Sequence, residues 1–257
     1  MKIILWNLRK GLVELFPTNK FRFILVLLIL IASFISVSEL LVAKLFAQII
    51  LHEGELETSK LKVYIVAFFI FYGLTRLGHF WHKIYRIRLI DKAFSAAEIK
   101  IRKSKENWRW SLAFQLTAIS SSLTQIFVIN GFFIYFNWIF GLVNLAIILI
   151  VLQIVGGIFK SQLKLQRRFA SAKKKKRKIA SLERVSTRIK SGEIGVLITG
   201  AAIIILLGVL FYLNYTGDIS AGNTIVLFFG LRMQNSNLSR ISKGLMKFAR
   251  ARTHSEK

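Results

Sequence analysis

Cysteine is absent from the 257 residues, proline occurs once, and acidic residues are scarce. Without cysteine the chain can form no disulfide, no thiolate metal site and no cysteine nucleophile. The sequence has 12 Asp and Glu against 38 Lys and Arg. The four histidines are scattered apart from a pair at positions 79 and 82. Because the residue types that nucleophilic or metal chemistry needs gather in no segment, the sequence argues against an enzyme, and we expect no cofactor.

Long apolar runs dominate the sequence instead. Hydrophobic residues make up 54% of the chain, and the mean hydropathy is +0.53. A helix needs about 20 predominantly apolar residues to cross the hydrocarbon of a bilayer. We therefore predict an all-α, polytopic membrane protein, with a transmembrane domain at 20–245 and a basic tail at 246–257. The six expected spans lie at about 21–51, 63–82, 111–135, 139–159, 194–213 and 223–241.

The segment 160–190 sets the expected topology, because it carries 13 basic residues and one acid between two apolar runs. Such cationic loops stay on the cytoplasmic side, where anionic lipid attracts them. This places both termini in the cytoplasm, and we expect the protein in the cytoplasmic (inner) membrane of a bacterium. The concentration of charge in segments that flank apolar runs also accounts for the net charge of +26, so no nucleic-acid partner is expected. The residues expected to contact anionic lipid or an acidic partner are Lys173, Lys174, Lys175, Lys176, Arg177 and Lys178.

The N-terminal residues 1–19 have the pattern of an interfacial helix. Ile4, Leu8, Leu12 and Leu15 fall on one face at helical spacing, and polar residues occupy the rest. Pro17 then separates this stretch from the first span. We interpret the stretch as an amphipathic helix lying in the membrane interface; the alternative is a frayed start of the first span.

Charged residues also lie inside apolar spans: Glu39 and Lys44 in the first, and the deep arginines Arg76 in the second and Arg232 in the sixth. A translocon-type scale puts the cost of a central Arg at about 2.5 to 3.5 kcal/mol, so such residues usually face protein or water. Our hypothesis is that Arg232 faces a cavity shared with the first and third spans, with Glu39 as its counter-ion. The alternative is that Glu39 snorkels to the outer interface or belongs to a structural ion pair.

Polar residues in the third and sixth spans extend this hypothesis. Gln115, Ser122 and Gln125 fall on or near one face of the third span, which should look into a cavity or onto another helix. Asn235 and Ser236 follow Arg232 by three and four residues and continue its polar face. In the second span, His79 and His82 share one helical face and could hold a metal ion. With no cysteine in the chain and no carboxylate within a turn of them, we interpret them as a polar helix end and expect no metal site.

Glycines in the fifth span are spaced for close contact between helices. Gly195, Gly200 and Gly208 recur along an otherwise aliphatic run, and small residues let the backbones of membrane helices approach.

The order of these features resembles the membrane domain of ABC exporters. An amphipathic helix ending in Pro is found in LRKGLVELFPTNKFRF, and the C-terminal passage TGDISAGNTIVLFFGLRMQNSNLSRISKGLMKFARAR places Gly217, Ser220, Gly222 and Arg250 comparably. The resemblance covers nearly the whole sequence. It differs in two respects: no GxxxxGK[ST] loop is present, and the two basic loops, 83–110 and 160–190, are shorter than those of exporters.

The resemblance implies a permease subunit that forms a homodimer or pairs with a related half-transporter. It would move a substrate by alternating access, with energy from a separate ATPase or from an ion gradient. The short loops favour a second function, that of a non-transporting membrane scaffold or accessory subunit of a larger complex. The charged residues inside the spans favour transport, because a scaffold has no need of them.

Overall fold

The computed structural model describes residues 2–51, 58–96, 103–174 and 180–255, and these residues form seven α-helices. The described part of the chain contains no strand, so the prediction of an all-α fold is confirmed. The helices, in chain order, are α1 (Lys2–Leu15), α2 (Asn19–Ile50), α3 (Thr58–Ala96), α4 (Lys103–Phe136), α5 (Trp138–Lys174), α6 (Ser181–Tyr215) and α7 (Ala221–Ser255).

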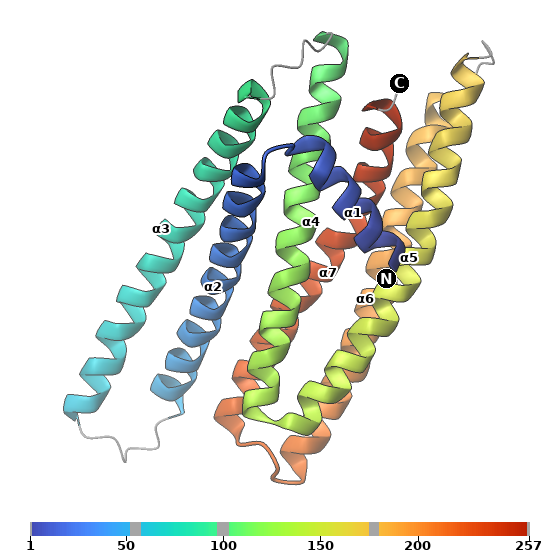
Figure 1. The fold of residues 1–257 in the computed structure, drawn as a ribbon. Helices are drawn as coiled ribbons and strands as arrows, with labels where there is room; N and C mark the ends of the chain where they lie inside the picture. Colours follow the sequence, from blue (N-terminus) through green and yellow to red (C-terminus); the bar gives the residue numbers. More distant parts are fainter. Residues whose placement is uncertain (1, 52–57, 97–102, 175–179, 256–257) are drawn as a thin grey trace.

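Six long helices run lengthwise beside one another, and the short α1 crosses in front of α4 and α5 (Figure 1). At one end of the molecule α3 and α5 finish and α4 and α6 begin, next to the C-terminal end of α7 (Figure 1, top). We call this the basic end, because most of the lysines and arginines of α3, α5 and α6 lie towards it. At the opposite end the chain turns between α4 and α5 and between α6 and α7.

Among the described residues, five helices are long and apolar enough to cross a membrane: α2 to α6. The protein is therefore a helical membrane protein with several spans. The expected sixth span is also a helix of 35 residues, but α7 is too polar to be counted with the other five. Its composition follows from its position, because α7 packs against α2, α4, α5 and α6 at once. A helix enclosed by other helices has little surface that lipid must cover, so it tolerates polar residues.

Buried amide side chains join α7 to two of its neighbours. The Nδ2 of Asn144 on α5 donates to Asn130 Oδ1 on α4 at 2.7 Å and to Gln234 Oε1 on α7 at 3.2 Å. The Nε2 of Gln234 donates back to Asn144 Oδ1 at 3.1 Å. All three residues are buried. We call these three side chains the amide cluster, and such interhelical hydrogen bonds hold helices together where no water competes.

One of the three glycines in the fifth expected span lies in a close helix contact. A Cβ on Gly195 would overlap Ser242 of α7, whose hydroxyl donates to the carbonyl oxygen of Gly192 at 3.0 Å. Nothing lies within 4 Å of a Cβ built on Gly200 or Gly208. Of the three glycines singled out by their spacing, therefore, only Gly195 lies in a close contact between α6 and α7.

The N-terminal helix α1 is fixed to the basic half of the bundle. Its buried apolar side chains Ile4, Leu8 and Leu15 belong to the same core as α4, α5 and α7. The guanidinium of Arg252, only 2% exposed, donates to the carbonyl oxygen of Asn7 at 3.0 Å and lies 3.7 Å from Glu14 Oε1. The C-terminal end of α7 thus holds α1 across the bundle, in an orientation clearly different from that of α2 (Figure 1).

Candidate functional site

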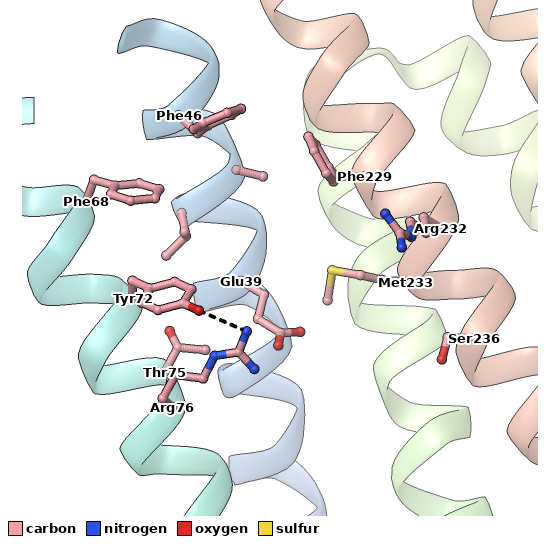
Figure 2. A pocket seen from close by; sticks show the side chains of 12 residues that line it. Glu39, Phe46, Phe68, Tyr72, Thr75, Arg76, Phe229, Arg232, Met233 and Ser236 are labelled. Atoms are coloured by element: carbon pink, nitrogen blue, oxygen red, sulfur yellow. Dashed lines mark hydrogen bonds between the residues drawn. The ribbon is translucent and has the colours of Figure 1, made fainter. Parts of the chain in front are cut away.

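A cavity of about 550 Å³ lies between α2, α3 and α7, and we call it the groove. It is bordered by four residues from each of the three helices, and Figure 2 shows their side chains. The lining residues are Glu39, Val42, Ala43, Phe46, Phe68, Tyr72, Thr75, Arg76, Phe229, Arg232, Met233 and Ser236. Most of the wall is therefore apolar or aromatic, with charged groups at a few points. A mainly apolar wall with a few placed polar groups is typical of ligand sites in proteins.

The groove exists because α3 packs chiefly against α2 and leaves α7 uncovered on that side. Polar contacts keep α3 on α2. The hydroxyl groups of Ser38 and Thr75 lie 2.6 Å apart. Nearer the basic end, His82 Nε2 lies 3.1 Å from the carbonyl oxygen of Leu28. The space between α3 and α7 is left to the groove.

Glu39 enters the groove from α2, and its hydrogen-bonding partner is a histidine. Its Oε1 lies 2.9 Å from His79 Nε2 on α3, with both side chains about one-third exposed. The sequence-based hypothesis names Arg232 as the counter-ion of Glu39 instead. The structure differs because the α2–α3 hairpin brings His79 within reach, whereas Arg232 approaches from the other wall (Figure 2). Glu39 and Arg232 share the groove, and no ion pair joins them in the described residues.

The two arginines of the groove have few partners. On α3, Arg76 Nη2 donates to the hydroxyl of Tyr72 at 3.2 Å, and its guanidinium lies 5.0 Å from the centre of that ring. On α7, Arg232 is exposed and makes no hydrogen bond or ion pair with any residue that the structure describes. Both point into the groove (Figure 2). By helical rise, Arg232 lies roughly 16 Å along α7 from the start of that helix, far from either end of the bundle.

The predicted polar face of the third span lies elsewhere. Gln125 Nε2 on α4 donates to the carbonyl oxygen of Ala32 on α2 at 3.0 Å, and Ser122 is fully buried. Gln115 lies against Gly244 of α7. These side chains mediate packing between helices, and none of them lines the groove. Asn235 is half-buried beside the groove residue Ser236 but does not line it either.

Sequence reasoning missed the aromatic wall and the partner of Glu39. Phe46, Phe68, Tyr72 and Phe229 line the groove, but in an apolar span such residues look like lipid-facing ones. A signal for His79 was available, because a short connection makes α2 and α3 an antiparallel hairpin whose polar residues meet. The amide cluster was missed because its members lie on three different helices.

Two other predicted sites have simple outcomes. His79 and His82 contact different partners, Glu39 and the Leu28 carbonyl. The described residues contain no group of three or more His, Asp or Glu side chains placed to hold a metal ion. Of the predicted lipid or partner contacts, Lys173 and Lys174 end α5, while Lys175, Lys176, Arg177 and Lys178 lie outside the described residues.

Comparison with known proteins adds no family to this picture. The chain matches no protein-family model and no curated protein.

Proposed function

We propose that the chain is a membrane permease subunit, similar in its helix order to the membrane domain of ABC exporters. The observation that carries the proposal is Arg232, an exposed guanidinium on a polar central helix, directed into a groove that apolar helices surround. Charges kept within a membrane bundle usually line a path for a substrate or an ion. In this proposal α7 crosses the membrane as a sixth span, shielded from lipid by its neighbours.

A second copy of the chain, or a related half, would complete the pathway. The groove separates α3 from α7 on the side of the bundle where α3 lies, and α3 carries exposed aromatic side chains such as Phe69, Phe80 and Trp81. A dimer that covers this side would enclose the groove, and alternating access would open it first to one aqueous phase and then to the other. Energy would come from a separate ATPase bound at the basic end or from an ion gradient. That end would face the cytoplasm.

The lining of the groove suits a substrate that joins an anionic group to an apolar body. Arg76 and Arg232 supply two positive charges, while the one carboxylate, Glu39, is engaged by His79. Phe46, Phe68 and Phe229 offer apolar and aromatic surface to the rest of the molecule. Guanidinium groups bind carboxylates and phosphates with paired hydrogen bonds, so the charged end of such a substrate would lie between the two arginines.

A second function, a non-transporting scaffold, is favoured by the short helical arms of the basic end. Past His82, the expected end of the second span, the described part of α3 runs on to Ala96, which is about 21 Å by helical rise. Arms of this length limit how far an ATPase could be held from the bilayer. A scaffold needs no water in the groove, and this separates the two functions by experiment.

Cysteine accessibility tests the proposal cleanly, because the chain has no cysteine of its own. Ser236→Cys places a thiol in the groove. A permease that alternates exposes this position to water on both sides, so a membrane-impermeant thiol reagent should label it from either side of sealed vesicles. Leu197→Cys is the matched control: it lies on α6 at a similar distance along the bundle, its side chain is 74% exposed, and it should face lipid and stay unlabelled.

Labelling of Ser236→Cys from one side only, or from neither, would overturn the permease and leave the scaffold. Co-purification then addresses the energy source. An ATPase recovered with the solubilised protein supports ATP coupling, whereas labelling that responds to collapse of the proton gradient supports an ion-driven permease.

A further inference from the structure

A second, smaller cavity lies at the basic end, where α5, α6 and α7 meet. Its volume is about 140 Å³, and it is separate from the groove in both position and lining. The lining residues are Gln166, Phe169, Ala170, Ser181, Arg184, Val185, Arg250 and His254. The space is enough for a few water molecules or one tetrahedral oxyanion. We call it the basic-end cavity.

Three arginines give this cavity a concentrated positive charge. Arg184 and Arg250 line it, and Arg188 lies one turn after Arg184 on α6. Burial, followed by the positive charges of Arg188 and Arg184, lowers the pKa of Arg250. Among the described residues that line the cavity none is acidic; the nearest acid in sequence, Glu183, is exposed on the first turn of α6. Arginines that repel one another around a cavity are stabilised when an anion occupies it.

One residue that lines this cavity has a hydrogen-bond donor without an acceptor. The side chain of Gln166 is buried, with the residue only 6% exposed. Its amide Nε2 has no hydrogen-bond partner among the residues that the structure describes. An unsatisfied buried donor costs about 1 to 3 kcal/mol, so its position indicates a missing acceptor. The first turn of α6 begins at Ser181, and its N-cap residue, Ala180, provides no side-chain acceptor. Free amide groups at a helix N-terminus favour anions.

We propose that the basic-end cavity binds a phosphoryl group, held by Arg184, Arg250, Gln166 and the N-terminus of α6. A phosphoryl group offers several acceptor oxygens and a double negative charge, which match two guanidiniums, one amide and the helix end. Its source is a soluble phosphate or phosphate monoester, or the phosphomonoester headgroup of a lipid such as phosphatidic acid. The site is independent of the groove and of any transport through it.

The structure supplies an optical reporter for this site. The guanidinium of Arg250 lies 5.1 Å from the centre of the Trp108 ring, and His254 stacks on the same ring with centroids 4.5 Å apart. A phosphoryl group that draws Arg250 towards the cavity changes the surroundings of this indole. Tryptophan emission should therefore shift with phosphate concentration, and Trp108→Phe should remove that response while phosphate still raises the melting temperature.

The first test titrates inorganic phosphate into the full-length protein in detergent, at constant ionic strength kept with chloride. Melting temperature and tryptophan emission should both change along one saturable curve. Arg184→Gln and Arg250→Gln should each raise the half-saturating phosphate concentration by about tenfold or more, because each removes a charge-assisted hydrogen bond. Arg168→Gln is the matched control, because Arg168 is an exposed arginine of α5 that does not line the cavity; its curve should match that of the unaltered chain.

The second test distinguishes the source of the phosphoryl group. Lipid nanodiscs of phosphatidylcholine alone are compared with nanodiscs that also contain phosphatidic acid. Protection by phosphatidic acid that Arg184→Gln abolishes identifies a lipid headgroup, and protection by inorganic phosphate alone identifies a soluble ligand; either supports the site. Since Arg250 is half-buried and its loss can disturb folding, Arg184→Gln, at an exposed position, is decisive. Equal, unsaturable responses in all variants, or no response to either phosphate source, would overturn the proposal.

Discussion

The two sides of α7 differ in whether their polar side chains form hydrogen bonds with neighbouring helices. On the side of α4, α5 and α6, polar side chains find one another: the amide cluster exchanges three hydrogen bonds, and Ser242 bonds to the backbone of α6. On the side of α2 and α3, Arg232 and Ser236 face the groove, and Arg232 has no hydrogen bond or ion pair within the described residues. One face of the same helix is built for packing and the other is left open.

The neighbouring helices show the same difference in burial. In the most apolar stretch of α4, 61% of the stretch is buried inside the protein, whereas in the corresponding stretch of α3 only 6% is buried. Beside the groove α3 packs against α2 and not against α7; at the basic end it also contacts α4, where the rings of Phe94 and Trp110 have centroids 5.2 Å apart. The comparison teaches that polarity along α7 has two meanings: the side chains of Gln234 and Ser242 hold helices together, whereas those of Arg232 and Ser236 border space that a ligand could fill. The predictions that follow test each meaning, from the largest expected effect to the smallest.

Substitution at the tightest contact of the packed side should have the largest effect. Gly195→Leu places a side chain where Ser242 of α7 already lies, and overpacking of this kind costs about 3 kcal/mol. The melting temperature of the detergent-solubilised protein should fall by many degrees. Gly200→Leu, on the same helix with open space at its Cβ, should leave it nearly unchanged. Equal effects of the two changes would mean that α6 does not approach α7 at Gly195.

The amide cluster should respond to partial removal more than to complete removal. Asn144→Leu leaves Asn130 and Gln234 buried without their partner, at a cost of about 1 to 2 kcal/mol. Replacing all three residues by Leu removes every polar group at once and should restore most of the lost stability. The measurement is thermal unfolding of the single and triple variants. A triple variant less stable than Asn144→Leu would contradict the account of the cluster as mutually satisfied packing.

The sequence predicted much of the architecture and only part of the groove, for a physical reason. Apolar runs and basic loops are local signals, so the helices and their approximate bounds could be predicted. Arg232 and Glu39 were singled out because charge in an apolar run is rare, and both line the groove. Their partners are set by how helices rotate against one another. Gln125, for example, satisfies a carbonyl of α2, and its helical spacing alone did not distinguish such a packing role from a cavity.

The groove should react at different rates with thiol reagents of opposite charge. With Arg76 and Arg232 in the groove, a thiol at Ser236→Cys should react roughly tenfold faster with a negatively charged reagent than with a positively charged one of similar size. Adding Arg232→Gln should reduce this ratio strongly. It should change the free energy of unfolding by no more than about 0.5 kcal/mol, because Arg232 has few contacts to lose. Arg240→Gln is a control, being an exposed arginine of α7 outside the groove lining. A ratio unaffected by Arg232→Gln would mean that this guanidinium does not set the potential of the groove.

The smallest effect is expected where α3 is attached to α2. Ser38→Ala removes the hydroxyl that meets Thr75 across the two helices, and interhelical hydrogen bonds in membrane proteins contribute about 0.6 kcal/mol on average. Thr75 keeps its bond to the Phe71 carbonyl, so global stability should hardly change. Movement of α3 should increase, however, and a thiol at Ala43→Cys, on the α2 wall of the groove, should label faster. Ser36→Ala, whose hydroxyl bonds only within α2 among the described residues, serves as the control. If both changes alter labelling equally, the Ser38–Thr75 contact does not hold α3 in place, and the width of the groove is set by apolar packing between α2 and α3.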